Sequence, residues 1–320
     1  MTPEFNLIEQ HFTRPTRNTK LGVGDDAALI SIGTDMELAI SADMLVVGTH
    51  FFADCDPYQL GWKSLAVNIS DMAAMGANPK WATLAIALPE VNQVWLAEFS
   101  RGFFACADAF NVDLIGGDTT RGPLTISVQI MGELPIGKAI KRNGAKVDDE
   151  IWISGKLGDA ALALQHLQSK LTLPKDTFIL CAKALHTPQP RVALGLALQD
   201  IANSAIDISD GLLADLGHIL KQSNIGAILE LKNIPHSSYA DFPIDLHDEN
   251  FRTIVLAGGD DYELCFTAPL EKHAGILKLS ESIKLPLTCI GHITTNNGIV
   301  VYGLENEILD IKETGFDHFS

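Results

Sequence analysis

Short apolar segments alternate with longer amphipathic ones along most of the chain. Residues 38–41, 81–88 and 124–134 have the composition of strands, whereas residues 91–110 repeat apolar positions at helical spacing. A further short strand over residues 112–115 is expected to end in a Gly-Gly-Asp turn. This alternation predicts a chain of the mixed α/β class.

A helix is predicted from Asp56 to about Met75. Asp56 is a good N-cap and Pro57 suits the first helical position. Gly76 is placed to end the helix in a left-handed conformation, and Pro79 prevents any continuation.

Three polar residues of this helix, Ser64, Asn68 and Asp71, fall on one face at positions i, i+4 and i+7. The rest of the segment is rich in Leu, Ala, Ile and Met, so this polar stripe must face either water or a site. Aspartate is a poor helix former in mid-helix. Metal ligation by Asp71 is therefore favoured over simple exposure, with a satisfied hydrogen bond as the main competing interpretation.

The second half repeats the alternation of elements. Strands are predicted over residues 150–154, 205–208 and 262–267, and helices over residues 159–167, 211–222 and 250–257. Asn296-Asn297-Gly298 between two apolar runs predicts a hairpin. Pro135-Ile136-Gly137-Lys138 is the best candidate boundary, which gives expected domains of residues 1–136 and 137–320.

Aspartates stand beside glycine or after apolar runs at five points. These are Gly22-Val23-Gly24-Asp25-Asp26, Ser41-Ala42-Asp43, Asn68-Ile69-Ser70-Asp71, Gly116-Gly117-Asp118 and Asp207-Ile208-Ser209-Asp210-Gly211. Carboxylates are the ligands that Mg²⁺ prefers, and adjacent glycines let a phosphate approach the backbone. The pattern indicates a metal–polyphosphate site, although the chain contains no Walker P-loop motif.

Composition excludes some partners. The net charge of -17 argues against nucleic acid or an anionic membrane, but bound Mg²⁺ can reverse the sign locally for a small phosphorylated ligand. The five cysteines form no C-x-x-C pair, and their odd number argues against a disulfide framework. Without an apolar signal-like segment or a membrane-length apolar run, we expect a cytoplasmic protein.

Each candidate residue also has a simpler interpretation when it is taken alone. Asp43 can merely end a strand, and Asp210 can be an N-cap. His50 as a lone histidine is more often structural, Arg142 is part of a solvated basic pair, and Phe316 is core by default. Together, however, so many carboxylates repel one another unless cations neutralise them.

The motifs in their order resemble the thiamine-monophosphate kinases, within the superfamily of aminoimidazole-ribotide synthetase-like ATP-using enzymes. The resemblance rests on the five acidic segments, on His50-Phe51, on Gly258-Gly259-Asp260-Asp261-Tyr262-Glu263-Leu264 and on Gly315-Phe316-Asp317-His318-Phe319. It implies phosphorylation of thiamine monophosphate by ATP to give thiamine diphosphate. It also implies a two-domain α/β (α+β) fold, a homodimer whose N-terminal domains pair through strands into a barrel, and active sites between domains.

The resemblance further implies a role for individual residues. Several Mg²⁺ ions would be held by Asp26, Ser41, Ala42, Asp43, Asp71, Asp118, Asp207 and Asp210. ATP would be contacted by Gly117, Asp118, Arg142 and Ser209, and the thiamine phosphate by His50, Asp260 and Phe316. No residue is expected to act as a general base, because an ionised phosphate is already a nucleophile for in-line transfer.

Two residues depart from the family pattern. Ala42 stands where Thr or Ser is common, which leaves only its backbone carbonyl as a ligand, and Asp260 stands where Glu is frequent, which shortens the reach by one methylene. Two alternative functions remain at this stage. One is another ATP-using enzyme of the superfamily, which makes an acyl phosphate, an iminyl phosphate or selenophosphate. Selenophosphate synthesis is disfavoured, because it would be expected to need a reactive cysteine near the N-terminal glycine loop, and the first cysteine of this chain is Cys55, beyond that loop. The other is a non-catalytic binding regulator.

Overall fold

The computed structural model describes residues 3–318 and divides into two compact units. The first contains residues 3–72 and 77–138, and the second contains residues 73–76 and 139–318. Helices and strands are mixed throughout, as the sequence predicts. No helix within the described residues is long and apolar enough to cross a membrane.

The first unit is built on a mixed sheet. Within the described residues its strands are β1 (Met36–Val46), β2 (Asn78–Leu88), β3 (Asp113–Arg121) and β4 (Thr125–Pro135), in the order β1-β4-β2-β3. Strand β4 is antiparallel to both neighbours, whereas β2 and β3 are parallel. Strand β1 therefore lies at one edge of the sheet, and α1 (Pro3–Phe12) precedes it in the chain.

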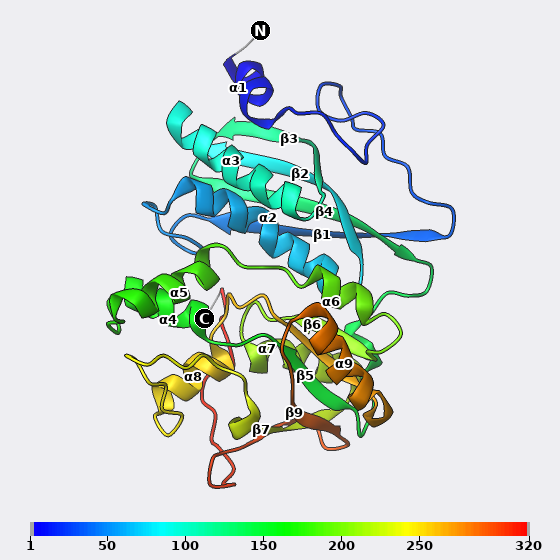
Figure 1. Ribbon diagram of the computed structural model, residues 1–320. Coiled ribbons are helices and arrows are strands. Elements are labelled where there is room, and N and C mark those ends of the chain that lie inside the picture. The colour runs from blue at the N-terminus through cyan, green and yellow to red at the C-terminus, as the bar shows by residue number, and fades with distance from the viewer. Residues whose placement is uncertain (1–2, 319–320) are drawn as a thin grey trace. The chain divides into compact units, whose positions relative to one another are not determined.

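Helices α2 (Pro57–Ala74) and α3 (Gln93–Ala109) cover one face of this sheet (Figure 1). The expected N-cap is confirmed, since the Asp56 carboxylate accepts from the Tyr58 N–H at 2.8 Å. The two helices approach closely at two glycines. A Cβ on Gly61 would lie 2.0 Å from the Phe99 carbonyl oxygen, and one on Gly102 would lie 1.8 Å from that of Tyr58. Any side chain at either position would force the helices apart.

Two predicted strand ends are wrong. Asp43 does not end its strand, because β1 pairs with β4 continuously from Met36 to Val46. The Gly-Gly-Asp segment does not follow β3 but lies within it, where it pairs with Leu84 and Ala85 of β2. In both cases the ladder hydrogen bonds to a neighbouring strand outweigh the local turn preference of glycine and aspartate.

The second unit is built on a larger sheet. Within the part that the structure describes, its strands are β5 (Glu150–Ser154), β6 (Ser204–Asp207), β7 (Gly226–Glu230), β8 (Leu264–Ala268), β9 (Leu287–Thr294) and β10 (Gly298–Tyr302), in the order β10-β7-β9-β5-β8-β6. Its α-helices are α4 (Asp159–Leu167), α5 (Lys175–His186), α6 (Val192–Ala197), α7 (Leu212–Ser223), α8 (Glu249–Ala257) and α9 (His273–Ile283). Short 3-10 turns are η1 (Arg142–Gly144), η2 (Leu231–Asn233) and η3 (Leu270–Lys272).

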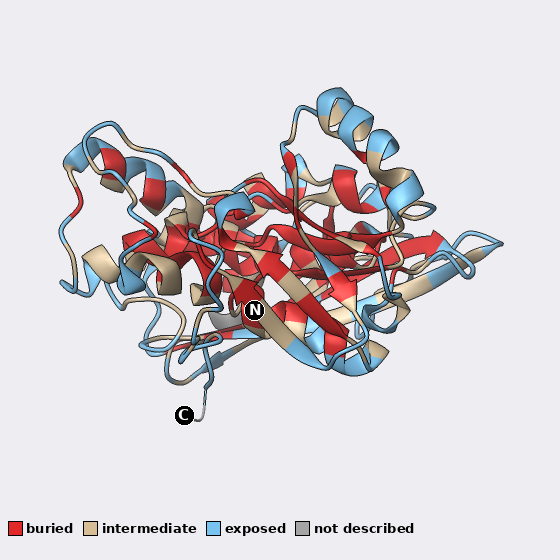
Figure 2. Cartoon of the chain, turned by 90° about the horizontal axis from the view of Figure 1, so that it is seen from below, coloured by how far each residue is buried: buried red, intermediate tan, exposed pale blue. Residues whose placement is uncertain are grey.

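Two apolar clusters show that helices cover both faces of this sheet. Successive residues of β5 point into one cluster and then the other. Ile151 and Ile153 pack in the cluster that contains α7, and Trp152 packs in the cluster that contains α6 and α9. Helices α4, α5 and α8 form a further cluster of their own. Figure 2 shows the buried positions gathered on the strands and on the helix faces that pack against them, while exposed positions are concentrated on the outer helix faces and in the loops.

The hairpin predicted at Asn296-Asn297-Gly298 is wrong. A turn with positive φ does form at Gly298, but β9 and β10 are not paired with each other, since β7 lies between them. Strand β10 runs parallel to β7. The turn fits against β7 because Gly226 lacks a side chain, and a Cβ there would lie 1.7 Å from the Asn296 carbonyl oxygen.

Candidate functional site

The polar stripe of α2 faces strand β1. The Ser41 hydroxyl donates to the Asp71 carboxylate at 2.6 Å, and the Asp43 N–H donates to the Asn68 side-chain oxygen at 3.0 Å. The Asn68 amide in turn donates to the Ser64 carbonyl at 3.0 Å, one helical turn earlier. The structure thus brings Ser41, Asp43 and Asp71 to one place, with Asn68 buried and fixed between strand and helix.

Asp118 lies on the opposite face of the same sheet. A row of cross-strand neighbours runs from Asp118 on β3 through Ala85 and Ser127 to Met44 on β1. Side chains in one row point to one face, and adjacent residues point to opposite faces, so Met44 and Asp43 diverge. Three strand spacings place Asp118 about 14 Å from β1. Within this unit Asp118 is therefore not brought together with Asp43 and Asp71.

Gly117 and Ala42 are both exposed on this sheet. Gly117 has φ of 152°, and a Cβ there would lie 1.8 Å from the Leu84 carbonyl oxygen. Only glycine fits this backbone, which leaves its own surface open to a ligand. Ala42 is opposite Gln129 in the register and shares the face of Asp118.

The glycine loop that carries Asp25 and Asp26 is closed and anchored. Leu21 and Leu29 pair at its base, and the Asp26 N–H donates to the Asp25 carboxylate at 2.9 Å. The segment before the loop is held by Asp113, which the sequence did not single out. Its buried carboxylate accepts from the Arg17 N–H at 3.0 Å, and from the Asn18 N–H and the Thr19 hydroxyl. Both loop acids remain exposed.

His50 sits in a tight turn that follows β1. Its Nδ1 accepts the Val46 N–H at 2.9 Å, so this nitrogen carries no proton. In the neutral ring the proton is then on Nε2, which becomes a hydrogen-bond donor. His50 is only partly exposed, and its orientation is determined by the turn itself.

In the second unit, Asp215 organises the turn between β6 and α7. Its carboxylate accepts the N–H groups of Ser209, Asp210 and Gly211 at 3.0, 3.0 and 3.1 Å. Asp210 is not the N-cap of α7, because that position is Gly211 and no side chain caps it. Burial raises the pKa of the Asp215 carboxyl to about 7, with Asp210 adding to the rise and the three N–H groups opposing it.

Two further motif segments attach to the same turn. The Asp260 N–H donates to the Ser209 carbonyl at 2.8 Å, and the Phe316 N–H donates to the Asp210 carbonyl at 3.0 Å. Gly259 permits the first contact, since a Cβ there would lie 2.4 Å from the Ser209 carbonyl oxygen. Ser209, Asp210, Asp260 and Phe316, which are far apart in the sequence, are thus brought together.

The environment of Asp210 reflects this convergence of segments. Burial raises the pKa of its carboxyl, Asp260 and Asp317 raise it further, and His318 and His218 oppose the rise. The Phe316 ring is 53% exposed and meets the His318 ring edge-to-face at 4.9 Å. The last residue of the Gly-Phe-Asp-His-Phe motif, Phe319, lies outside the described residues.

The remaining two candidates of this unit occupy different environments. Asp207 is buried at the end of β6 and pairs with Leu264. Arg142 lies exposed in η1, where its carbonyl accepts the Ser223 hydroxyl at 3.1 Å and so joins η1 to the end of α7.

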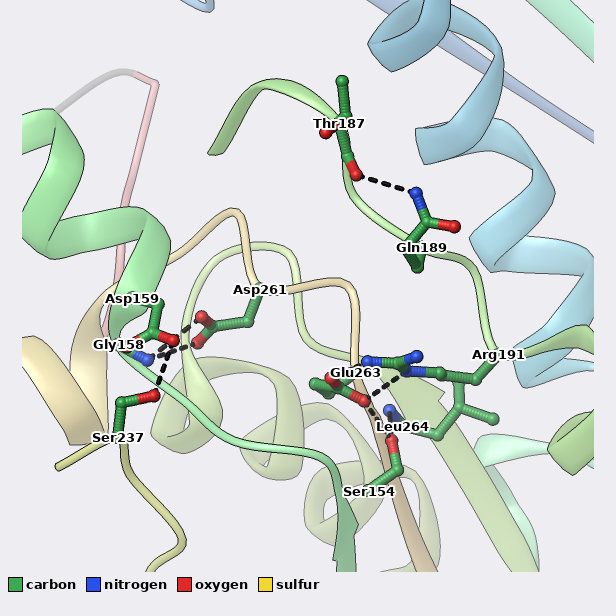
Figure 3. Close-up of polar contacts among 10 residues, drawn as sticks. All are labelled: Ser154, Gly158, Asp159, Thr187, Gln189, Arg191, Ser237, Asp261, Glu263 and Leu264. Carbon is green, nitrogen blue, oxygen red and sulfur yellow. Dashed lines mark hydrogen bonds and ion pairs between the residues drawn. The ribbon is translucent and has the colours of Figure 1, made fainter. Parts of the chain in front are cut away.

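Beside the Gly-Gly-Asp-Asp segment lies a second network that the sequence did not reveal (Figure 3). Glu263 is buried, accepts the Ser154 hydroxyl at 2.5 Å and is paired with both Nε and Nη2 of Arg191. Burial raises the pKa of the Glu263 carboxyl, and Arg191 opposes the rise. Asp261 accepts the Gly158 N–H at 3.0 Å, and burial holds its pKa well above the usual range.

The carboxylates are dispersed rather than gathered into one cluster. Across residues 3–318, no group of three or more His, Cys, Asp or Glu side chains is placed to hold a metal ion. The sites that the structure does assemble are the Ser41–Asp43–Asp71 group in the first unit and the Ser209–Asp210–Asp260–Phe316 group in the second.

Comparisons with known proteins place these motifs in a family. Residues 24–134 match the family described as AIR synthase related protein, N-terminal domain. The thiamine-monophosphate kinase of Escherichia coli K12 is 44% identical over 325 residues, which cover 99% of this chain and 98% of that protein. The chain belongs to the thiamine-monophosphate kinase family. The family predicted from the motifs is confirmed.

Solved structures agree with this assignment. The crystal structure of thiamine-monophosphate kinase from Stenotrophomonas maltophilia K279a has a TM-score of 0.84 at 43% identity, covering 95% of this chain and 96% of that one. AaThiL complexed with AMPPCP and TMP has a TM-score of 0.77 at 26% identity, covering 98% of this chain and 96% of that one. The predicted two-domain fold of the aminoimidazole-ribotide synthetase-like class is confirmed.

Replacing Asp215 by alanine is expected to destabilise the second unit. Three N–H groups, of which that of Gly211 is buried and the other two are partly buried, would lose their acceptor, which should lower the free energy of unfolding by roughly 2–4 kcal/mol. Asp215→Asn retains one acceptor oxygen and should cost less. Urea denaturation gives the size of the effect, and amide hydrogen exchange at residues 209–211 should accelerate first. Unchanged protection of these amides in Asp215→Ala would contradict this role.

Proposed function

We propose that this protein transfers the γ-phosphoryl group of ATP to thiamine monophosphate, giving thiamine diphosphate and ADP. The observation that carries the proposal is the set of motif segments joined around the Ser209–Gly211 turn, in a chain 44% identical to a thiamine-monophosphate kinase along its whole length. A structural relative binds AMPPCP, an ATP analogue, together with TMP. These two ligands correspond to the two substrates.

The reaction needs no covalent intermediate on the protein. An oxygen of the substrate phosphate forms a bond to the γ-phosphorus while the bond from that phosphorus to the β,γ-bridging oxygen breaks, and ADP leaves. The attacking oxygen is already ionised, so no residue is required as a base. The work of the chain is to bind, to orient both phosphates in line and to exclude water.

Mg²⁺ fits the chemistry of the acidic side chains. We infer that Asp26, Ser41, Asp43, Asp71, Asp118, Asp207 and Asp210 hold several ions, with the backbone carbonyl at Ala42 in place of the hydroxyl common in the family. Oxygen donors alone suit a hard cation. The placement of Asp118 on the sheet face opposite Asp43 supports more than one ion. Bound Mg²⁺ would neutralise the charge of the phosphates.

ATP would be contacted by Gly117, Asp118, Arg142 and Ser209. Gly117 offers a bare backbone at an exposed position, and the Arg142 guanidinium can pair with phosphate oxygens. The Ser209 N–H is already used by Asp215, so its hydroxyl is the group left to donate to a phosphate.

Thiamine monophosphate would be held by His50, Asp260 and Phe316. Because Nδ1 of His50 accepts the Val46 N–H, the neutral ring carries its proton on Nε2, and an N–H donor of this kind suits a phosphate oxygen. Asp260 supplies a carboxylate for an amine or a cationic ring. The half-exposed Phe316 ring provides a face for stacking on an aromatic ring of the substrate.

We further propose that residues 1–136 bind Mg-ATP and mediate dimerisation, while residues 137–320 complete the nucleotide and substrate sites. Support for a homodimer comes from the first unit's sheet. Ile40 and Met44 of the edge strand β1 point to the face not covered by α2 and are 55% and 56% exposed. A second copy would cover this apolar face and its unpaired strand edge. All five cysteines are free, as a cytoplasmic location would require.

The direct test is thiamine diphosphate formation by the purified protein with ATP, Mg²⁺ and thiamine monophosphate. We expect product from the monophosphate and none from thiamine, because the acceptor must be a phosphate oxygen. Chromatographic separation of thiamine, its monophosphate and its diphosphate provides the measurement. Intact nucleotide binding without any product would overturn the proposed function.

Asp71→Asn should reduce kcat/KM by at least about 100-fold, because it removes charge from a proposed metal ligand. The asparagine oxygen can still accept the Ser41 hydroxyl, so the unfolding free energy should change little. Steady-state kinetics over a range of Mg²⁺ concentrations separates the two effects. The control is Asp108→Asn, which removes an exposed partner of Arg14 and should leave turnover unchanged. Near-normal activity in both Asp71→Asn and Asp43→Asn would rule out the metal assignment.

Met44→Asp is expected to convert a dimer to a monomer without unfolding the chain. The side chain is exposed in the single chain, so the charge is tolerated there but not beneath a second copy. Sedimentation equilibrium gives the oligomeric state. Val94→Asp on α3 is the control, since Val94 is also exposed, at 76%, and lies on a helix rather than on the sheet. A wild-type protein that is monomeric at micromolar concentration would refute the dimer.

A further inference from the structure

Tyr262 holds the carboxylate of Asp260. The Tyr262 hydroxyl donates to Oδ1 of Asp260 at 3.1 Å, and the tyrosine side chain is only 8% exposed. Because Asp260 and Tyr262 are two residues apart in an irregular segment, a hydrogen bond between them depends on the local backbone. The contact joins a buried ring to an acid that is proposed to meet the substrate.

The backbone that makes this contact is unusual. Asp260 has φ of 66° and Tyr262 has φ of 50°, a left-handed conformation that is uncommon for non-glycine residues. Such conformations persist where the surrounding structure over-determines them, and they gather at functional sites. Here the Asp260 and Tyr262 N–H groups donate to the carbonyls of Ser209 and Ile208, both at 2.8 Å.

We propose that Tyr262 is a positioning residue that orients the Asp260 carboxylate toward thiamine monophosphate. This inference rests on the proposed function and assigns a role to a residue outside the proposed ligand set. The phenol bound to Oδ1 fixes the rotation of the carboxylate, and in that orientation the carboxylate would accept from the amino group of the substrate's pyrimidine or pair with its cationic ring. A carboxylate one methylene shorter than glutamate has less reach, so its direction matters more.

A simpler role for Tyr262 is the packing of its ring, and substitution by phenylalanine distinguishes this packing role from the positioning role. Tyr262→Phe retains the ring but removes the hydroxyl. We expect KM for thiamine monophosphate to rise roughly tenfold, as the loss of one hydrogen bond to a charged group would produce. KM for ATP should not change, because Ser209 and Asp210 keep their own contacts to Asp215.

A double-mutant cycle with Asp260→Ala decides whether the two residues act together. If Tyr262 acts through Asp260, adding Tyr262→Phe to Asp260→Ala should leave KM for thiamine monophosphate unchanged. The matched control is Tyr239→Phe, which also removes a tyrosine hydroxyl from an aspartate, Asp159, at 2.8 Å, but should leave both KM values as in the wild type.

Three outcomes would overturn the inference. These are an unchanged KM in Tyr262→Phe, an equal rise in KM for both substrates, or a full additional effect in the Asp260→Ala background. Wild-type turnover of thiamine monophosphate, measured in the same series, tests the proposed function separately. Isothermal titration with thiamine monophosphate gives the same comparison as a binding constant, so a variant of low turnover still yields a result.

Discussion

The assembly of the second unit's site depends on one carboxylate and three backbone N–H groups. A turn between a strand and a helix leaves several N–H groups without acceptors, and here Asp215 reaches back from the first turn of α7 to satisfy three of them. The turn is thereby rigid, and its carbonyls are free to accept from other segments. Asp260 and Phe316 are attached through those carbonyls. The positions of Asp260 and Phe316 therefore depend on the turn that Asp215 holds.

In the first unit, several acidic side chains lie on one sheet, and their negative charges repel one another where they are close together. The fold places Asp43 beside the polar stripe of α2 and Asp118 on the other face, three strands away. Asn68, a neutral residue, occupies the buried position between strand and helix. Asp118 is thus separated in space from Asp43 and Asp71, which reduces the repulsion among the carboxylates of this sheet.

Much of this arrangement could be predicted from local patterns. The bounds of α2 follow from Asp56, Pro57 and Gly76, because capping and chain termination are determined by neighbouring residues. The polar stripe on α2 was visible as helical spacing, and its partner strand confirms that it faces into the protein. The order of the glycine-flanked acidic motifs along the chain was sufficient to indicate the family.

What could not be predicted depends on partners distant in the sequence. Asp43 and the Gly-Gly-Asp segment resemble strand ends locally, yet β4 and β2 extend the pairing through them. The expected hairpin at Asn297-Gly298 fails because β7, some seventy residues earlier, is inserted between its two strands. Nothing in a local window shows which strand will be the neighbour.

Asp215 and Glu263 differ in how much of their role the sequence indicates. Asp215 is four residues after Gly211, in a first helical turn that is otherwise apolar, a position from which a carboxylate can reach the N–H groups of the preceding turn. Glu263 stands between Tyr262 and a buried strand, where a charge demands a partner, but only the fold shows that the partner is Arg191. A buried acidic residue therefore indicates that a network of hydrogen bonds or ion pairs surrounds it. The other residues of that network are determined by the tertiary structure. For the same reason, the position of Asp260 is best understood through Tyr262 and Ser209, which bind its carboxylate and its backbone N–H.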